Sequence, residues 1–287
     1  MPSTRFVVPF GGEGAADRAA RAFARSFAPL AGDIAIENVP GEGGLAGVRH
    51  ANALAAQSAA PVLLLGTPST HILLPRRRGP KAAPDEAFVP LLGLGFAPNV
   101  LLASPRLGVR TVDELVARAK AGGLVYASAG AGQTIHVCTA FFCELAGFDM
   151  THRPFDGGSA GAYAELVAGR VHVYFDNLLG CRGALERGEA VPLAVSSAGR
   201  SRLLPEVPTL IERGFPEHAL DVWFGVFGAH LDAATPDLAI AVRAEGSLSG
   251  ELAELGLSGG ISGPEKLAGQ IEACAPSWRR ALEAAGR

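Results

Sequence analysis

The sequence lacks the long hydrophobic run that a membrane-spanning helix requires. Its 287 residues are 48% hydrophobic, yet no apolar stretch approaches the roughly 20 residues needed to cross a bilayer. The first residues, MPSTRFVVPF, contain no basic segment followed by an apolar core, so no signal peptide is visible. That absence fits a cytoplasmic protein, or a secreted one whose leader is missing from this sequence.

Cysteine and net charge are also low. The four cysteines have no metal-site spacing, and we expect all of them to be small buried residues; they are Cys138, Cys143, Cys181 and Cys274. The formal net charge of −3 gives no electrostatic reason to expect a nucleic acid or an anionic membrane as a partner. The seven histidines include no pair four residues apart and no H-E-x-x-H motif. We therefore predict neither a metal nor a cofactor.

Glycine, by contrast, is abundant at 37 residues, about 13% of the chain against a usual value of roughly 7%. Two glycine-rich stretches have the same setting. RFVVPF (5–10), a predicted strand, precedes the loop GGEGAAD (11–17), and LVYAS (124–128) precedes AGAGQ (129–133). After both loops, apolar residues recur at helical spacing until a Leu-Ala-Gly stop. We infer two α/β domains of similar plan.

The rest of the chain alternates between strands and helices. Further strands are predicted over 33–39, 61–67, 99–104, 150–155, 171–177, 191–197 and 221–229, and helices over 48–56, 160–168 and 179–187. Such alternation predicts mostly parallel sheets with helices on both faces. The tail from 236 to 287 is predicted to be mainly helical, and Pro276 should kink its last helix or split it in two.

An enzyme is the alternative to a binding protein. Residues 157–161, GGSAG, match the G-x-S-x-G nucleophile elbow of α/β-hydrolase-like serine esterases, with Ser159 as the nucleophile. Asp176 and two later histidines, His218 and His230, follow in the hydrolase order. However, the preceding strand MTHRPFDGG is polar and charged, unlike the buried strand that such an elbow requires, and no HGGG-type segment precedes it.

A second catalytic arrangement combines Ser128, His136 and Asp156, although nothing in their spacing demands it. Nucleotide binding has less support still. The loop GGEGAAD contains neither G-x-G-x-x-G nor the G-K-[ST] ending of a P-loop.

A binding site needs less than an active site. The N-terminus of a helix presents unpaired N–H groups and about half a positive charge, so a small loop above it can hold an anion. Glycines let the backbone approach the ligand closely. Two such loops, one in each domain, suit a small molecule with carboxylate groups, and we predict a binding protein without catalytic turnover.

Several segments carry a family resemblance. They are RFVVPF with its loop and Asp17, IENVPGEGGLAG (36–47), LLLGTPSTHILLP (63–75), YASAGAGQTIH (126–136), AELVAGRVHVYFDN (164–177), LAVSSAGRSRLLPEVPTLIERGFP (193–216) and DVWFG (221–225). In order and spacing they resemble segments of the Bug-type, TctC-like periplasmic solute-binding receptors of tripartite tricarboxylate transporters, among them ENRPGAGG, GTPSTH and GSAGNGSTSH. The resemblance runs nearly end to end.

The resemblance implies a type II periplasmic-binding-protein fold, with two α/β domains around a ligand cleft and a two-stranded hinge. By that likeness, domain 1 combines residues 1–103 and 222–287, and domain 2 spans 104–221, with crossings near 102–104 and 222–224. It implies a receptor that captures a small organic carboxylate, which can be a di- or tricarboxylate, an amino acid or an aromatic acid. The partners would be transporter membrane subunits or a sensor kinase, and the receptor would be a periplasmic monomer.

The same likeness implies the ligand-binding residues. They are Phe10, Gly11, Gly12, Glu13, Gly14, Thr67 and Ser69 in the first domain, and Ser128, Ala129, Gly130, Gly132, Thr134, Phe155 and Asp176 in the second. Backbone N–H groups and hydroxyls of these loops hold the ligand in the family, so Ser128 is expected to donate a hydrogen bond and not to attack.

The first loop departs from the family pattern. Where the family usually has PPGGGTD, this chain has GGEGAAD, in which Glu13 adds a negative charge and Ala16 lacks a hydroxyl. An acid beside a bound carboxylate is repulsive. Either Glu13 turns outward, or the ligand carries an amino or other cationic group. We expect the second loop to hold the carboxylate and the first loop to read the rest of the ligand.

Overall fold

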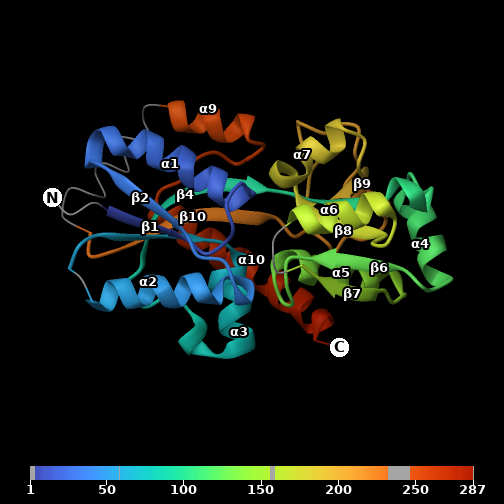
Figure 1. Cartoon of the computed structure of the whole chain (residues 1–287), viewed down its shortest axis with the longest axis horizontal. Helices are drawn as coiled ribbons and strands as arrows, with labels where there is room; N and C mark the ends of the chain where they lie inside the picture. The colour runs from blue at the N-terminus through green and yellow to red at the C-terminus, as the bar shows by residue number, and fades with distance from the viewer. Residues whose placement is uncertain (1–3, 58, 156–158, 232–245, 287) are drawn as a thin grey trace. The chain divides into compact units, whose positions relative to one another are not determined.

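The computed structural model describes residues 4–57, 59–155, 159–231 and 246–286 (Figure 1). The chain divides into two compact units. The first combines Met1–Phe96 with Trp223–Ala275, and the second combines Ala97–Val222 with Pro276–Arg287. Each unit contains a five-stranded sheet and helices, so the predicted α/β class with two domains is confirmed.

The first sheet forms from the apolar runs near both ends of the chain. Its strands are β1 (Thr4–Val8), β2 (Ile34–Asn38), β3 (Val62–Gly66), β4 (Val89–Ala97) and β10 (Val222–Ala229). They lie in the order β2-β1-β3-β10-β4. β1 pairs in parallel with β2 and β3, whereas β10 runs antiparallel to β3. β3 and β10 are buried along their whole length, as expected for strands covered on both faces.

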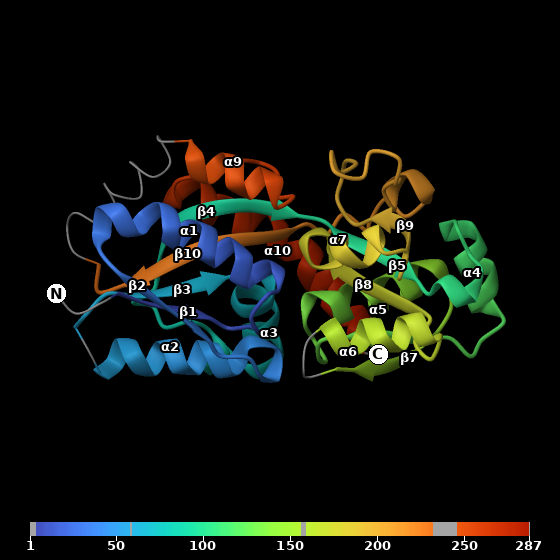
Figure 2. The ribbon, with the colours of Figure 1, turned by 45° about the horizontal axis from the view of Figure 1, so that its top comes forward.

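Helices cover both faces of this sheet. They are α1 (Ala15–Ala31), α2 (Leu45–Gln57), α3 (Leu74–Arg78), α9 (Ser247–Glu254) and α10 (Pro264–Ala285), with the short segments η1 (Glu42–Gly44), η2 (Ser69–Leu73) and η3 (Pro80–Ala82). α1 and α2 lie on opposite faces (Figure 2), because their right-handed crossovers run in opposite directions along the sheet. α9 packs against α1, where Arg25 and Glu251 form an ion pair.

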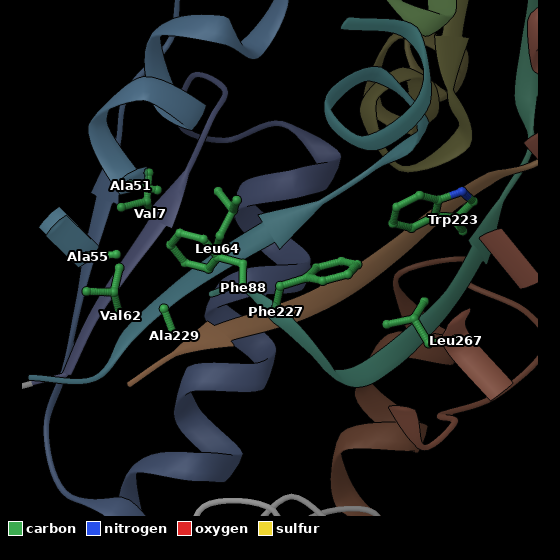
Figure 3. Close-up of a cluster of buried hydrophobic side chains, with 10 residues drawn as sticks. All are labelled: Val7, Ala51, Ala55, Val62, Leu64, Phe88, Trp223, Phe227, Ala229 and Leu267. Atoms are coloured by element: carbon green, nitrogen blue, oxygen red, sulfur yellow. The ribbon is translucent and has the colours of Figure 1, made fainter. Parts of the chain in front are cut away.

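A hydrophobic cluster packs against the first sheet (Figure 3). It consists of 10 residues: Val7, Ala51, Ala55, Val62, Leu64, Phe88, Trp223, Phe227, Ala229 and Leu267. Fully burying a large apolar side chain stabilises a fold by roughly 1.5–3 kcal/mol. Trp223 and Phe227 are 1% and 3% exposed, so β10 is held in the first unit although it is distant from β3 in sequence.

The second unit repeats this plan. Its elements are β5 (Asn99–Ala103), η4 (Pro105–Leu107), α4 (Val112–Lys120), β6 (Val125–Ser128), α5 (Thr134–Ala146), β7 (Thr151–Pro154), α6 (Ser159–Ala168), β8 (Val173–Asn177), α7 (Leu178–Glu186), β9 (Val191–Val195) and η5 (Ile211–Arg213). The strand order is β7-β6-β8-β5-β9. β6 is parallel to β7 and β8, and β5 is antiparallel to β8 and β9. The two sheets therefore share one topology, as the duplicated strand, loop and helix predicted, but both are mixed sheets and not mostly parallel ones.

The course of the chain differs from expectation at two places. The chain enters the second unit between Phe96 and Ala97, and β5 lies wholly in the second sheet. The family resemblance implied instead that residues up to 103 belong to domain 1. α10 continues through Pro276 as one helix, so the predicted split does not occur. Residues from 276 onward belong to the second unit, where Arg280 pairs with Glu144 of α5.

Candidate functional site

Each sheet has one point at which the strand order reverses. In the second sheet, α5 carries the chain from β6 to β7 on one side, and α6 returns it to β8 on the other side of β6. The first sheet reverses in the same way between β1 and β3. In open α/β sheets, ligands bind beyond the carboxyl ends of the strands at such a switch point. The two switch points are therefore the candidate site, one in each unit.

The predicted ligand residues gather at these switch points. They are Phe10, Gly11, Gly12, Glu13, Gly14, Thr67 and Ser69 after β1 and β3, and Ser128, Ala129, Gly130, Gly132, Thr134 and Asp176 at the ends of β6 and β8. Phe155 follows the edge strand β7, but its N–H donates to the Ser128 carbonyl at 2.8 Å. It therefore borders the same loop as the other residues of the second unit.

Ser128 holds the start of the second loop. It is fully buried, and its Oγ lies 2.6 Å from His152 Nε2, lies 3.2 Å from the Gly130 carbonyl and accepts the N–H of Gly130 at 3.1 Å. The single hydroxyl proton serves either the imidazole or the carbonyl. The hydroxyl that we expected to donate to a ligand is thus engaged within its own loop.

His136 anchors the other end of the second loop. It is the third residue of α5, and its Nδ1 accepts the N–H of Gly132 at 3.1 Å. A ring nitrogen that accepts a hydrogen bond carries no proton, so this bond requires a neutral imidazole with its proton on Nε2. Gly132 has a φ of 79°, in the left-handed region where glycine has no steric penalty. A neutral group therefore fixes the loop.

Two further rings lie beside His136. The ring centroids of Tyr126 and His152 are 4.9 Å apart, and those of His136 and His152 are 4.3 Å apart. Burial lowers the pKa of His152 and raises the pKa of Tyr126, because a buried group disfavours its charged form. Neither His152 nor Tyr126 is therefore charged at neutral pH.

The N-terminus of α5 is suited to an anion. The side chain of Gln133, the N-cap residue, makes no cap bond and instead donates from Nε2 to the Ala129 carbonyl at 2.9 Å. The first turn contains no acidic residue. Since the first turn of a helix carries about half a positive charge, this turn offers a favourable potential to an anion.

Asp176 is tied into the interior of the second unit. It is 6% exposed; its Oδ2 accepts the Tyr163 hydroxyl at 2.8 Å, and its Oδ1 accepts the Asn177 N–H at 2.8 Å. Burial raises the pKa of Asp176 to about 6, although the two hydrogen bonds act in the opposite direction. Its side chain faces α6, and each of its two carboxylate oxygens accepts a hydrogen bond.

The first loop has an anchor in the equivalent position. Asp17 is the third residue of α1 and accepts the N–H of Glu13 at 3.0 Å, Arg21 Nε at 2.9 Å and Asn38 Nδ2 at 2.9 Å. Burial acts to raise the pKa of Asp17, but these hydrogen bonds outweigh it and hold the pKa below its ordinary value. Asp17 and His136 each accept the N–H four residues earlier, so the first loop is anchored by an anion and the second by a neutral ring.

Glu13 lies at the tip of the first loop with its side chain exposed. Its φ is 66°, a left-handed conformation that costs a residue with a side chain roughly 1–2 kcal/mol. Its N–H donates to Asp17, and its carbonyl accepts Arg18 Nε at 3.0 Å. The backbone of Glu13 is thus used to close the loop, and contact between its carboxylate and a cationic ligand group stays a hypothesis.

Thr67 supplies a buried hydroxyl at the first switch point. It is 3% exposed, and its N–H donates to Thr70 Oγ1 at 3.1 Å. Within the part of the chain that the structure describes, Thr67 Oγ1 has no hydrogen-bond partner. A buried hydroxyl in this state costs free energy unless water or a ligand satisfies it.

The residues proposed for an esterase are not assembled. Ser159 begins α6, and residues 156–158, with Asp156 among them, lie outside the described residues. His218 Nε2 donates to the Cys138 carbonyl at 2.9 Å, and His230 Nε2 donates to the Ala55 carbonyl at 2.8 Å. Since Asp176 binds Tyr163 and Asn177, it does not orient either histidine, and the esterase alternative has no support.

The second catalytic arrangement does not form between Ser128 and His136, and its third member, Asp156, lies outside the described residues. Ser128 contacts His152 Nε2 and not the predicted His136, whose Nδ1 is occupied by Gly132. Ser128 is fully buried, and its Oγ accepts the N–H of Gly130 and contacts His152 within the folded unit. Sequence reasoning missed this role of His152 because it depends on the pairing of β6 with β7, in which Tyr126 lies opposite His152.

Two other expectations concern the chemistry of the chain. All four cysteines are free, but Cys274 is only partly buried, which corrects the expectation for that residue. Over the described ranges, no group of three or more His, Cys, Asp or Glu side chains is placed to hold a metal ion. No helix in those ranges has the length and apolar character needed to cross a membrane.

Two α/β units of shared topology, each with a glycine-rich loop before a helix at its switch point, are the architecture of a solute-binding protein. The chain belongs to the tripartite tricarboxylate transporter family receptors, TctC, which it matches over residues 19–241. It is a solute-binding receptor of this family.

The relatives cover most of the chain. It is 29% identical to the UPF0065 protein in the tcbD-tcbE intergenic region of Pseudomonas sp. strain P51, over 96% of this chain and 84% of that protein. It is 31% identical to Protein BugT of Bordetella pertussis, over 77% of this chain and 69% of that protein.

Solved structures show the same fold. The R. palustris protein Rpa4515, determined with adipate, is 30% identical and superimposes with a TM-score of 0.82, covering 99% of this chain and 97% of that one. The periplasmic binding protein BugD gives a TM-score of 0.83 at 24% identity, covering 100% of this chain and 99% of that one. The predicted type II periplasmic-binding-protein fold is confirmed.

Proposed function

We propose that this receptor captures a small organic carboxylate and that the second loop, Ser128 to Thr134, holds a carboxylate group of the ligand. One observation carries the proposal. The N-terminus of α5 has no acidic residue in its first turn, and the loop above it is anchored by the neutral ring of His136. A carboxylate there would meet the positive end of the helix, and neither the first turn of α5 nor the anchor of the loop adds a negative charge.

The first loop is less suited to an anion. Its anchor, Asp17, is a buried carboxylate with a lowered pKa and is therefore ionised at neutral pH, and Glu13 adds an exposed acid. We infer that the first loop, together with Thr67 and Ser69, contacts the part of the ligand remote from the carboxylate that the second loop binds. This division supports the expectation drawn from the sequence.

The ligand class and the biological setting belong to the same proposal. Because Rpa4515 carries adipate at 30% identity to this chain, dicarboxylates are the first candidates, followed by tricarboxylates, amino acids and aromatic acids. We propose a periplasmic monomer without catalytic turnover that delivers its ligand to transporter membrane subunits or to a sensor kinase. The periplasmic setting is supported by BugD, a periplasmic binding protein of the same fold.

A thermal-shift screen of organic acids, amino acids, sugars and nucleotides tests the proposal. A ligand at a hundred times its Kd adds about 2.7 kcal/mol to the free energy of unfolding, which gives a clear shift in Tm. We expect hits among small carboxylates. Stabilisation by sugars or nucleotides alone would refute the proposal.

A matched pair of variants then locates the carboxylate. Thr134 is the first residue of α5, and Thr134→Val should weaken carboxylate binding by roughly 1–3 kcal/mol, the effect of losing a hydrogen bond to a charged group. Thr139→Val is the control, since the Thr139 hydroxyl donates within α5 to the Ile135 carbonyl at 2.9 Å. Isothermal titration calorimetry should show weaker binding for the first variant only.

A further inference from the structure

Asn177, the last residue of β8, has an amide oxygen without a donor. The residue is 9% exposed. Its Nδ2 donates to Asn99 Oδ1 at 2.7 Å, and Asn99 Nδ2 in turn donates to Cys138 Sγ at 3.2 Å. No group among the described residues donates to Asn177 Oδ1. Buried acceptors are nearly always satisfied in folded proteins, so this oxygen is a place for a donor that the described residues do not supply.

Asn177 lies on the face of the second sheet that α5 covers. Successive side chains of a strand point to opposite faces. Asp176 faces α6, because it accepts the hydroxyl of Tyr163. Phe175 faces α5, because its ring packs against Phe142. Asn177 follows Phe175 by two positions and therefore shares the α5 face.

The first turn of α5 extends past the end of β8. Phe142 lies against Phe175, and Cys138, one turn nearer the start of α5, is linked to Asn177 through one intervening amide. One helical turn advances about 5.4 Å and two strand residues advance about 6.6 Å, so helix and strand remain in step. The next turn, which begins at Thr134, therefore lies beyond Asn177, at the edge where the second loop begins.

The planar amide decides which way Asn177 Oδ1 points. The oxygen and the nitrogen diverge from the same carbon, and the nitrogen points to Asn99 on β5. The oxygen therefore turns away from Asn99 on β5, and β6 is the neighbour of β8 on its other side. That side is the switch point of the second unit, with the second loop above it.

We propose that Asn177 Oδ1 determines specificity by accepting a hydrogen bond from a hydroxyl or ammonium group that the ligand carries beside its carboxylate. The inference rests on the proposed function, because it places the carboxylate at the N-terminus of α5. An ionised carboxylate has only acceptor atoms, so a plain dicarboxylate leaves Asn177 Oδ1 unpaired. A hydroxy or amino acid satisfies it. Sites that hydrogen-bond one substrate group reject the analogue that lacks it, since their own polar atom is then left buried without a partner.

Calorimetric titration with matched acids tests this inference. Succinate, malate and aspartate differ by a hydrogen, a hydroxyl and an ammonium on one carbon, and adipate with 2-aminoadipate forms a longer pair. We expect the wild type to bind a donor-bearing acid roughly tenfold or more tightly than the plain acid of the same length, as for the loss of a hydrogen bond that leaves a buried partner. The ratio between malate and aspartate tells whether the donor is a hydroxyl or an ammonium.

Variants assign the preference to one atom. Asn177→Leu removes the acceptor at similar volume and should bring the ratio of affinities close to one, whereas Thr139→Val should leave the ratio unchanged. Asn177→Asp is the second variant. It keeps an acceptor of the same shape and adds a negative charge, so it should increase the preference for aspartate over succinate. Thermal melts of each variant confirm that it is folded.

Each other outcome has a definite meaning. Equal binding of plain and donor-bearing acids by the wild type would overturn the inference and leave the receptor function intact. Failure of every acid to bind would instead refute the proposed function. A preference that survives in Asn177→Leu would assign the donor to another acceptor. An equal loss of affinity for all acids would mean that Asn177 turns its NH2 group to the carboxylate, and either result overturns the inference.

Discussion

At the scale of single residues, the two loops differ in the charge of one anchor. Asp17 and His136 occupy the third position of α1 and α5, and each accepts the N–H of the residue four positions earlier. The same backbone bond is therefore made by a carboxylate in one unit and by an imidazole in the other. The imidazole leaves the second loop without negative charge, and this difference should appear in the affinity for anions.

His136→Asn and His136→Asp test that difference. Both side chains keep an acceptor for the Gly132 N–H and remove the same ring, but only aspartate adds a charge. Two charges about 4–8 Å apart interact by roughly 2–4 kcal/mol at an effective dielectric constant of about 20. We therefore expect His136→Asp to bind carboxylates at least tenfold more weakly than His136→Asn in calorimetric titrations. Added salt should narrow the gap, and equal affinities would mean that the carboxylate binds elsewhere.

The roles of single residues were also the hardest to predict from the sequence. The family likeness placed Ser128 at the site, but its buried contact with His152 depends on how β6 pairs with β7. The anchoring role of Asn38 likewise depends on the packing of β2 beside α1, where its amide reaches Asp17. Contacts between residues distant in sequence carry no local signal, so neither role could be predicted.

At the scale of elements, the start of α2 is packed directly against the residues that follow β1 and β2. A Cβ added at Gly47 would lie 2.4 Å from Pro9 Cα and 3.0 Å from the Val39 carbonyl oxygen. Both atoms belong to the backbone that directly follows a strand of the first sheet, so they have little freedom to move away. The glycine is therefore required by the close approach of the helix and not by the helix itself.

Gly47→Ala and Gly250→Ala should have opposite effects on stability. Alanine usually stabilises a helix relative to glycine by roughly 0.5–1 kcal/mol, and Gly250, on α9, has no atom within 4 Å of an added Cβ. At Gly47 the clash should instead destabilise the protein by about 1–3 kcal/mol, as overpacking does. Urea unfolding measures both changes. A gain in stability at Gly47 would contradict the close packing described here.

Most of the long elements could be predicted because their apolar periodicity is local, and β4 and α4 are among those missed, for different reasons. β4 contains Pro90, Gly93 and Gly95, which weaken a strand signal, and it is held by long-range bonds to Ser258 and Ser262. α4 could have been predicted, since Thr111 and Glu114 form a capping box, a local pattern that marks the start of a helix.

At the scale of the whole molecule, histidines and aspartates that are buried or half-buried have opposite effects on stability as the pH changes. Burial lowers the pKa of His71 to about 3 and that of His218 to about 4. The unfolded state therefore binds more protons below about pH 6.5, and stability falls as the pH drops through that value. Burial raises the pKa of Asp176 and Asp221 to about 6. Between about pH 4 and 6 the folded state therefore binds more protons on these two carboxyls than the unfolded state does. This contribution to stability rises as the pH drops through that range.

The double variant Asp176→Asn, Asp221→Asn removes the second effect. Its free energy of unfolding should fall more steeply than that of the wild type from pH 6 to pH 4, by roughly 1–3 kcal/mol for each carboxyl. Urea unfolding followed by circular dichroism at half-unit steps of pH measures the difference. Asp113→Asn, at an exposed position of α4, is the control and should run parallel to the wild type. Parallel curves for the double variant would contradict the expectation.

The order of the strands along the chain has a consequence for synthesis. All strands of the second sheet lie between residues 99 and 195, whereas the first sheet pairs β3 with residues 225–229 of β10. A nascent chain emerging from the ribosome can thus complete the second sheet from one continuous stretch. Until β10 has been synthesised, the edge of β3 that pairs with β10 stays unpaired. Unpaired edges of this kind pair readily with other chains. The late arrival of β10 therefore ends the interval in which this edge of β3 is open to pairing with other chains.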